Sequence, residues 1–146
     1  MSEDFVSYSI MQFFKDNGWM IAQYHPPGGQ ASFGIRISGE MLYPDLIGCK
    51  DSRIVVMENK PRYNAEDIEK LRKMMADPGA NGQIVSFVKN FCYTHNIKTY
   101  DTFALFWAHG FSGKQIPDPL PDVNLIYVDR EGNITVKAAS RHPLIV

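Results

Sequence analysis

The sequence predicts an α/β fold in which a central mixed β-sheet is flanked by helices and followed by a C-terminal β-hairpin. Apolar residues recur at helical spacing in three segments of the chain. Between these segments lie short β-branched or aromatic runs of strand length. The expected order is a helix, about four strands, two helices, a strand and a hairpin, which is typical of helices packed on the faces of a sheet.

Length and composition indicate a single domain over residues 1–146. The chain is 45% hydrophobic and 21% charged, which is ordinary for a globular protein with a sizeable core. It contains no apolar run of membrane-spanning length and no signal-peptide pattern, so we expect no membrane partner. Cys49 and Cys92 lie in apolar segments without the spacing of a zinc site. We expect free thiols and a cytoplasmic, reducing location.

The first half of the chain predicts one helix and four strands. Residues 2–17 are expected to be helical because Val6, Ile10 and Phe13 follow helical spacing, and Gly18 is a good helix stop. The remaining segments are predicted from β-rich runs and from turn residues. They are strands at 19–24, 33–37, 41–49 and 54–57, a loop at 25–30 and a turn at 52–53, with Pro61 ending the last strand.

The second half predicts two helices, a strand and a hairpin. Asn64 is placed to cap a helix that ends at residues 77–79. Its apolar face is formed by Ala65, Ile68, Leu71 and Met75. Its solvated face is expected to hold the i,i+4 pairs Glu66–Lys70 and Glu69–Lys73. The later segments are a helix at 83–95, an interior strand at 102–109, an irregular stretch at 111–122 and a hairpin of 125–129 with 134–137.

Charged residues gather at the end of the apolar strand 54–57. Side chains alternate along a strand, so Glu58 and Lys60 should share the face of Ile54. A hairpin would also bring Glu58 close to Asp45, and two adjacent carboxylates repel unless a cation or a proton lies between them. A divalent metal meets this need, and Mg²⁺ favours one or two carboxylates together with water and phosphate oxygens.

Pro44-Asp45, twelve intervening residues and then Glu58-Asn59-Lys60 resemble the signature of the PD-(D/E)XK nuclease superfamily. This group includes many restriction endonucleases, Holliday-junction resolvases, some homing endonucleases and various repair nucleases. The resemblance covers roughly residues 41–107, and the position of the short motif across two predicted strands makes it more specific. It implies a restriction-endonuclease-like core of a helix, three strands, a helix and a strand. It also implies a nuclease domain that hydrolyses DNA phosphodiester bonds.

The resemblance implies a catalytic set of Asp45, Glu58 and Lys60. Asp45 and Glu58 would hold one or two Mg²⁺ ions, for which Mn²⁺ could substitute, with the Asn59 carbonyl as a further ligand. Lys60 would orient or help to deprotonate the attacking water and would stabilise charge at the phosphorus. An N-terminal helix often supplies an extra acid in this family, and Glu3 is the candidate. Alternatively, Glu3 is a first-turn acid favoured by the helix dipole.

The expected partners are DNA and further copies of this chain. A homodimer or higher homo-oligomer is expected because one site per chain cuts one strand at a time. The net charge of −1 means that DNA binding would depend on a local basic patch. Arg62 and Tyr63 could contact the substrate backbone there, or they could be exposed strand-end residues.

A different class of function stays open, namely a non-catalytic nucleic-acid-binding or assembly module with an incidental acid pair. The intact set of Asp45, Glu58 and Lys60 argues against it, because a degenerate site would more readily have lost one of them. Restriction, homing, junction-resolving and repair roles are not separated by the sequence. Specificity resides in loops and accessory elements rather than in the fold.

Overall fold

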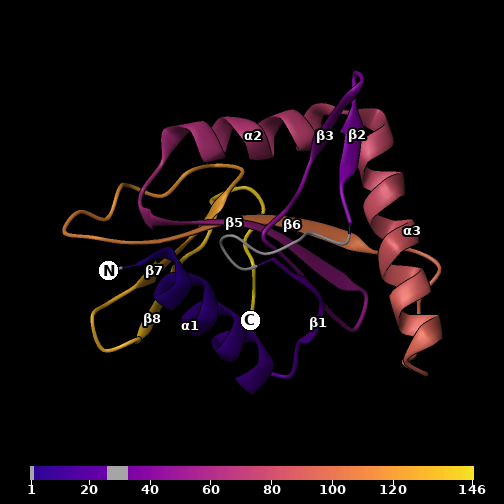
Figure 1. Ribbon diagram of the computed structural model, residues 1–146, viewed down its shortest axis with the longest axis horizontal. Helices are drawn as coiled ribbons and strands as arrows, with labels where there is room; N and C mark the ends of the chain where they lie inside the picture. Colours follow the sequence, from indigo (N-terminus) through magenta and orange to yellow (C-terminus); the bar gives the residue numbers. More distant parts are fainter. Residues whose placement is uncertain (1, 26–32) are drawn as a thin grey trace.

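The structure is a computed structural model that describes residues 2–25 and 33–146. It confirms the predicted α/β class, with a six-stranded mixed sheet flanked by three helices (Figure 1). The helices are α1 Glu3–Asp16, α2 Ala65–Ala76 and α3 Pro78–Thr94. The strands of the large sheet are β1 Met20–Tyr24, β4 Leu46–Lys50, β5 Arg53–Arg62, β6 Ala104–Ser112, β7 Asn124–Val128 and β8 Ile134–Lys137. A separate two-stranded sheet pairs β2 Ile35–Ile37 with β3 Glu40–Leu42.

The large sheet has the strand order β1-β4-β5-β6-β7-β8. Strands β1, β4 and β5 pair antiparallel, β5, β6 and β7 pair parallel, and β8 returns antiparallel to β7. The parallel step from β5 to β6 passes through α2 and α3, as a parallel pair requires a crossover connection. The predicted C-terminal hairpin is confirmed and forms one edge of the sheet.

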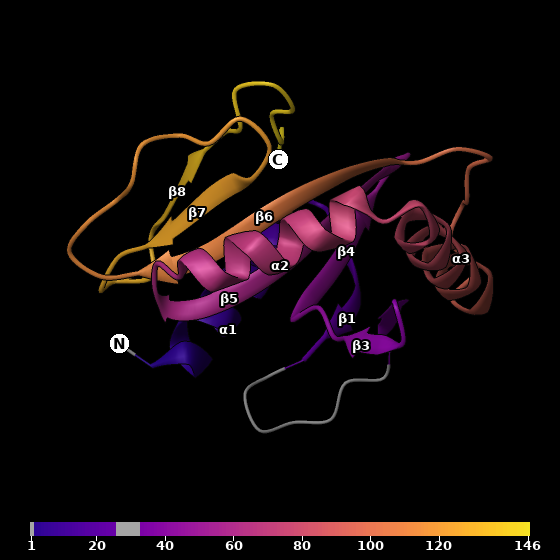
Figure 2. The same ribbon diagram turned by 90° about the horizontal axis from the view of Figure 1, so that it is seen from above.

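Helices cover both faces of the sheet. Figures 1 and 2 show α2 lying over β5 and β6, with α3 beside it, and α1 on the opposite face. Alternate residues of β5 enter the two cores. Ile54 and Val56 pack in the cluster that contains buried residues of α2 and α3, whereas Val55 and Met57 pack in the cluster that contains those of α1. No helix among the described residues is long and apolar enough to cross a membrane.

The prediction of one strand over residues 41–49 was wrong. The structure has β3 ending at Leu42 and β4 beginning at Leu46, with a break between them. Pro44 carries no N–H and restricts the residue before it, so it favours a break. After the break the Asp45 N–H donates to the Met57 carbonyl, which starts the pairing of β4 with β5.

Three predicted boundaries were also wrong. Strand β5 continues through Pro61 to Arg62, because the pairing with β6 shifts register there and a bulge tolerates a proline. Helix α3 begins at Pro78, where the Asp77 side chain accepts from two backbone N–H groups, and proline is favoured in a first turn. Strand β6 extends to Ser112. Within the predicted loop 25–30, residues 26–30 lie outside the described part of the chain.

Candidate active site

Asp45, which immediately precedes β4, lies opposite Glu58, which is within β5. Leu46 pairs with Met57, so the next antiparallel position brings Asp45 against Glu58. The Asn59 N–H donates to Asp45 Oδ2 over 2.8 Å, which fixes that carboxylate beside the end of β5. Glu58 is 2% exposed, and the Asp45 carboxylate is close enough to raise its pKa. The expected approach of the two carboxylates is therefore present in the structure.

The Glu58 carboxyl is in an unfavourable place for a negative charge. Burial raises the pKa of Glu58 well above its usual range, and the Asp45 carboxylate raises it further. The Lys70 ammonium acts in the opposite direction but does not cancel these effects. Two carboxyl groups in this arrangement either share a proton or need a cation beside them.

Lys70 on α2 supplies a positive charge to this pair. Its Nζ lies 2.7 Å from Glu58 Oε1 and 3.4 Å from the Tyr43 carbonyl oxygen. The contact with Glu58 is an ion pair by distance, although Oε1 lacks a partner in hydrogen-bond geometry within the described residues. The sequence predicted a solvated Lys70 paired with Glu66, and this was wrong. An i,i+4 pair contributes only a few tenths of a kcal/mol, whereas a buried carboxylate needs a counter-charge much more strongly.

The predicted ion pair between Glu69 and Lys73 is also absent. Lys73 pairs with Glu40 of β3 at 2.8 Å, and Glu69 pairs with Arg72 at 3.2 Å. The buried methionine of α2 is Met74, whereas the prediction placed Met75 on the apolar face.

Lys60 and Glu3 form an ion pair at the other side of β5. Lys60 Nζ lies 3.5 Å from Glu3 Oε1, so the first turn of α1 does reach the site, as a partner of the lysine. Burial lowers the pKa of Lys60, but the carboxylates of Asp67, Glu3 and Asp45 outweigh it and leave the pKa raised. The ammonium is therefore charged at neutral pH.

Glu58 and Lys60 were predicted to share one face of the strand, but their charged ends contact different helices. Glu58 meets Lys70 of α2, whereas Lys60 meets Glu3 of α1. The register of β5 shifts between Asn59 and Arg62, and this irregularity interrupts the alternation that the prediction assumed. The site thus lies between the two helix layers, around the second half of β5.

Asp67 is a further acid that sequence analysis did not identify. It lies in the first turn of α2, is 7% exposed, and its pKa is raised by burial. Its Oδ2 has no hydrogen-bond partner among the described residues, and His109 Nδ1 lies 3.9 Å from it. In the sequence, an aspartate at this position is indistinguishable from an ordinary first-turn acid.

His109 on β6 connects the acid strand to α2 and was also missed. Its Nε2 accepts from the Asn64 N–H over 3.1 Å, so Nδ1 carries the proton and donates to the Glu58 carbonyl over 3.0 Å. Burial lowers the pKa of His109 to about 4, which keeps the ring neutral. This histidine holds the backbone of Glu58 and the start of α2 together. Its position follows from the parallel pairing of Glu58 with His109, which no local pattern reveals.

The backbone of Asn59 faces Asp45, whereas its side chain is buried beside Gly110. The side chain is fully buried, and a Cβ on Gly110 would lie 2.4 Å from its Oδ1. Glycine at position 110 thus leaves room for the amide. The Asn59 N–H points at Asp45, and in a paired strand the carbonyl of the same residue points to the same side. That oxygen is therefore directed toward the acid pair.

The donors at this site fit a hard divalent cation. The described residues contain no group of three or more His, Cys, Asp or Glu side chains that could hold a metal ion, so an all-protein cage is absent among them. Two carboxylates and a backbone oxygen suit Mg²⁺, which keeps several waters and uses phosphate oxygens as ligands. They do not suit zinc, which prefers nitrogen and sulfur. The charged groups here are the acids Glu3, Asp45, Glu58 and Asp67 and the bases Lys60 and Lys70, a formal surplus of two negative charges.

Comparison with models of known protein families finds no match to this chain. A search of curated proteins finds no match either. The functional interpretation therefore depends on the geometry of the site and on the motif that it contains.

Proposed function

We propose that this chain is a metal-dependent endonuclease of the PD-(D/E)XK type that hydrolyses DNA phosphodiester bonds. The observation that carries the proposal is the position of Asp45, just before β4, opposite the buried Glu58 of β5. The succession α1, β1, β4, β5, α2 and β6 also supports it. Leaving aside the small β2–β3 sheet and α3, this is the helix, three strands, helix and strand that the motif implies.

Each residue of the site has a role in this proposal. Mg²⁺ or Mn²⁺, held by Asp45, Glu58 and the Asn59 carbonyl, would polarise the phosphoryl oxygen and activate water. The Lys60 ammonium stabilises the negative charge that develops on the phosphoryl oxygens and orients the attacking water. Glu3 holds this ammonium through the 3.5 Å ion pair. The water loses a proton as its oxygen bonds to phosphorus, one phosphorus–oxygen bond to a sugar breaks, and the leaving oxygen takes up a proton.

Lys70 neutralises Glu58 in the metal-free protein. Its ammonium is 2.7 Å from the carboxylate that a divalent cation would also contact. Two cations on one carboxylate repel each other, so metal binding competes with this ion pair. Removal of Lys70 should therefore affect the metal-free protein more than the metal-loaded one.

The active form in this proposal is a homodimer or a higher homo-oligomer. Each chain carries one acid pair, and cutting both strands of a duplex needs two sites or two events. Light scattering of the free protein and of its DNA complex tests this. A monomer in both samples would contradict it.

The decisive experiment compares wild type with Glu58→Gln on supercoiled, linear, single-stranded and four-way DNA, with Mg²⁺ or with EDTA. Wild type should cut in Mg²⁺ and not in EDTA, and Glu58→Gln should cut slower by orders of magnitude. DNA binding in Ca²⁺ should be retained or strengthened, because a negative charge facing the phosphates is lost. Asp45→Asn and Lys60→Ala should show the same loss of cutting.

Glu66→Gln is the matched control, since it removes an exposed acid from the first turn of α2. It should leave cutting unchanged. Equal cutting by wild type and Glu58→Gln would exclude the role of Glu58. Robust DNA binding without any cutting by wild type would instead support a non-catalytic nucleic-acid-binding or assembly module.

A further inference from the structure

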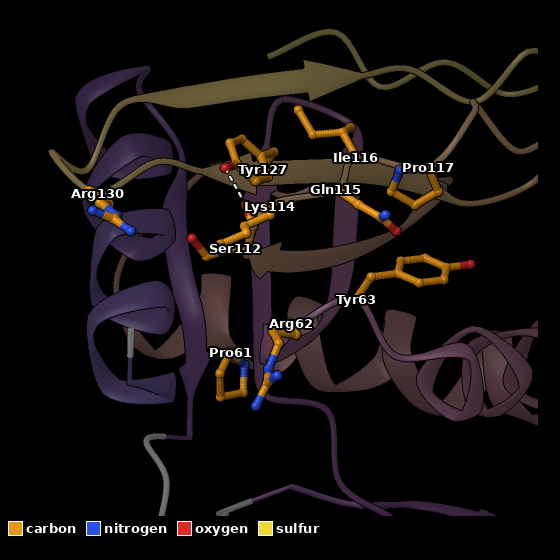
Figure 3. A pocket seen from close by; sticks show the side chains of 11 residues that line it. Pro61, Arg62, Tyr63, Ser112, Lys114, Gln115, Ile116, Pro117, Tyr127 and Arg130 are labelled. Carbon is orange, nitrogen blue, oxygen red and sulfur yellow. Dashed lines mark hydrogen bonds between the residues drawn. The ribbon is translucent and has the colours of Figure 1, made fainter.

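A cavity of about 1030 Å³ opens directly beyond the motif strand. Figure 3 shows Pro61 and Arg62 on the β5 side of this cavity, with Gln115, Ile116 and Pro117 across from them. The segment that follows β6 and the turn between β7 and β8 complete its lining. We call this cavity the basic groove.

The basic groove carries three cations from three different elements. Arg62 ends β5, Lys114 follows β6, and Arg130 lies in the turn after β7. All three side chains are exposed, and none of them forms an ion pair with a carboxylate within the described residues. None of the described residues that line the groove is acidic. This local surplus of positive charge contrasts with the chain's net charge of −1.

Specific contacts hold the walls of the groove in place. The Tyr127 hydroxyl donates to the Gly113 carbonyl, which ties the start of the 113–117 segment to β7 (Figure 3). Gly113 adopts φ 111°, a conformation that favours glycine, and a Cβ there would lie 3.4 Å from Arg62 Cγ. The stem of Arg62 therefore packs against this segment.

The shape and charge of the groove suit an extended anionic chain better than an enclosed small molecule. Small-molecule sites are mostly apolar pockets of roughly 300–1,000 Å³ that bury most of the ligand. Here the cations are exposed, and the volume of about 1030 Å³ slightly exceeds that range. Arg62 is two residues from Lys60, so a strand with one phosphate at the acid pair continues naturally to the groove.

We infer that the basic groove binds the phosphodiester backbone of the DNA strand next to the phosphate that is cut, with Arg62, Lys114 and Arg130 as phosphate contacts. This inference rests on the proposed function for the position of the scissile phosphate. Such contacts would fix the register of the strand and carry no sequence information. Tyr63, at the edge of the groove, has its ring held edge-on against His109 and Phe111. This packing gives the groove a rigid rim.

The test is a triple variant, Arg62→Ser, Lys114→Ser and Arg130→Ser, whose DNA affinity is measured in Ca²⁺ over a range of salt concentrations. Each lost phosphate contact should reduce the slope of log K against log[salt] by about 0.9 for duplex DNA. At 0.1 M salt this corresponds to a loss of about eightfold per contact relative to 1 M salt. The triple variant should thus bind two to three powers of ten more weakly, and the single variants should each lose about one unit of slope.

The matched control is Lys15→Ser, Lys98→Ser and Arg141→Ser, which removes the same charge from positions that do not line the groove. Its salt slope should stay within a few tenths of the wild-type slope. The same proteins are also assayed in Mg²⁺ on bis(4-nitrophenyl) phosphate, which is too small to extend from the acid pair along the groove. For the groove variant, the loss on DNA should exceed the loss on this substrate at least tenfold.

An unchanged slope in the groove variant, or an equal loss in both triple variants, would overturn the inference and leave the nuclease proposal standing. An equal loss on DNA and on the small phosphodiester would also overturn it, because the groove would then act through the acid pair. If wild type cuts nothing but binds DNA through these cations, the nuclease proposal fails and the groove stands. Wild type that binds no DNA would overturn the groove.

Discussion

Lys70→Met tests how much the buried Glu58 depends on its counter-charge. At 2.7 Å and an effective dielectric constant of about 20, the gross attraction between the two charges is about 6 kcal/mol. Most of this offsets desolvation, and removing one partner of a fully buried pair costs about 3–5 kcal/mol. The Lys70 side chain is 29% exposed, and Glu58 can take up a proton instead. We therefore expect a loss of about 2 kcal/mol, or about 6 °C in Tm for a chain of this length.

The assay is urea and thermal unfolding in EDTA and again in excess Mg²⁺. Lys73→Met is the matched control on the next turn of α2, because its partner Glu40 is exposed and solvent screens that ion pair. In Mg²⁺ the deficit of Lys70→Met should shrink, since the cation replaces the ammonium and ligand binding at 100 times Kd adds about 2.7 kcal/mol. Equal losses of stability by both variants in EDTA would refute a special role of Lys70. Equal stabilisation of wild type and Lys70→Met by Mg²⁺ would refute it as well.

Two further predictions concern the framework of the site. Gly110→Ala should lower the free energy of unfolding by about 1–3 kcal/mol in urea titrations, because its Cβ would approach Asn59 Oδ1 to 2.4 Å. Gly82→Ala, where a Cβ meets nothing within 4 Å, should instead be neutral or slightly stabilising, and an equal loss in both would contradict the steric argument. The pKa of Asp122 is lowered by its hydrogen bonds from Arg72, so this pair stabilises the fold above pH 4 and the benefit disappears as the pH falls through the lowered pKa. Asp122→Asn should therefore lose about 1 kcal/mol or less at pH 7 and match wild type once the pH is below the lowered pKa, and a deficit that stays constant with pH would count against this assignment.

The sequence was sufficient where the interaction is local. Asp45 and Glu58 belong to adjacent strands of one hairpin, so alternation and the turn between them place the two carboxylates together. The C-terminal hairpin followed from its turn residues in the same way. Lys60 was identified by the motif, but its orientation was not, because the register shift in β5 has no marker other than Pro61.

The sequence was insufficient where position depends on packing between distant segments. Lys70 borders the apolar stripe of α2, and its partner becomes known only when α2 is docked over β5. His109 depends on the parallel register of β5 and β6, which is set across two intervening helices. Asp77 shows a different difficulty, since it ends α2 and caps α3 at the same time. The Asp-Pro-Gly signal therefore marked a junction of two helices rather than a loop.

The pairing of Asp45 with Glu58 has a consequence for how the chain folds. These residues belong to a short hairpin, whereas Glu58 and His109 are 51 positions apart in the sequence. Closing the longer loop costs about 1 kcal/mol more chain entropy than closing the hairpin, so we expect the two carboxylates to meet before β6 is in place. The nascent sheet would then carry an uncompensated electrostatic repulsion, which should slow the rate-limiting step of folding. Stopped-flow refolding would show this as faster folding of Glu58→Gln than of wild type in EDTA, and equal rates would mean that the hairpin and the distant strand assemble together.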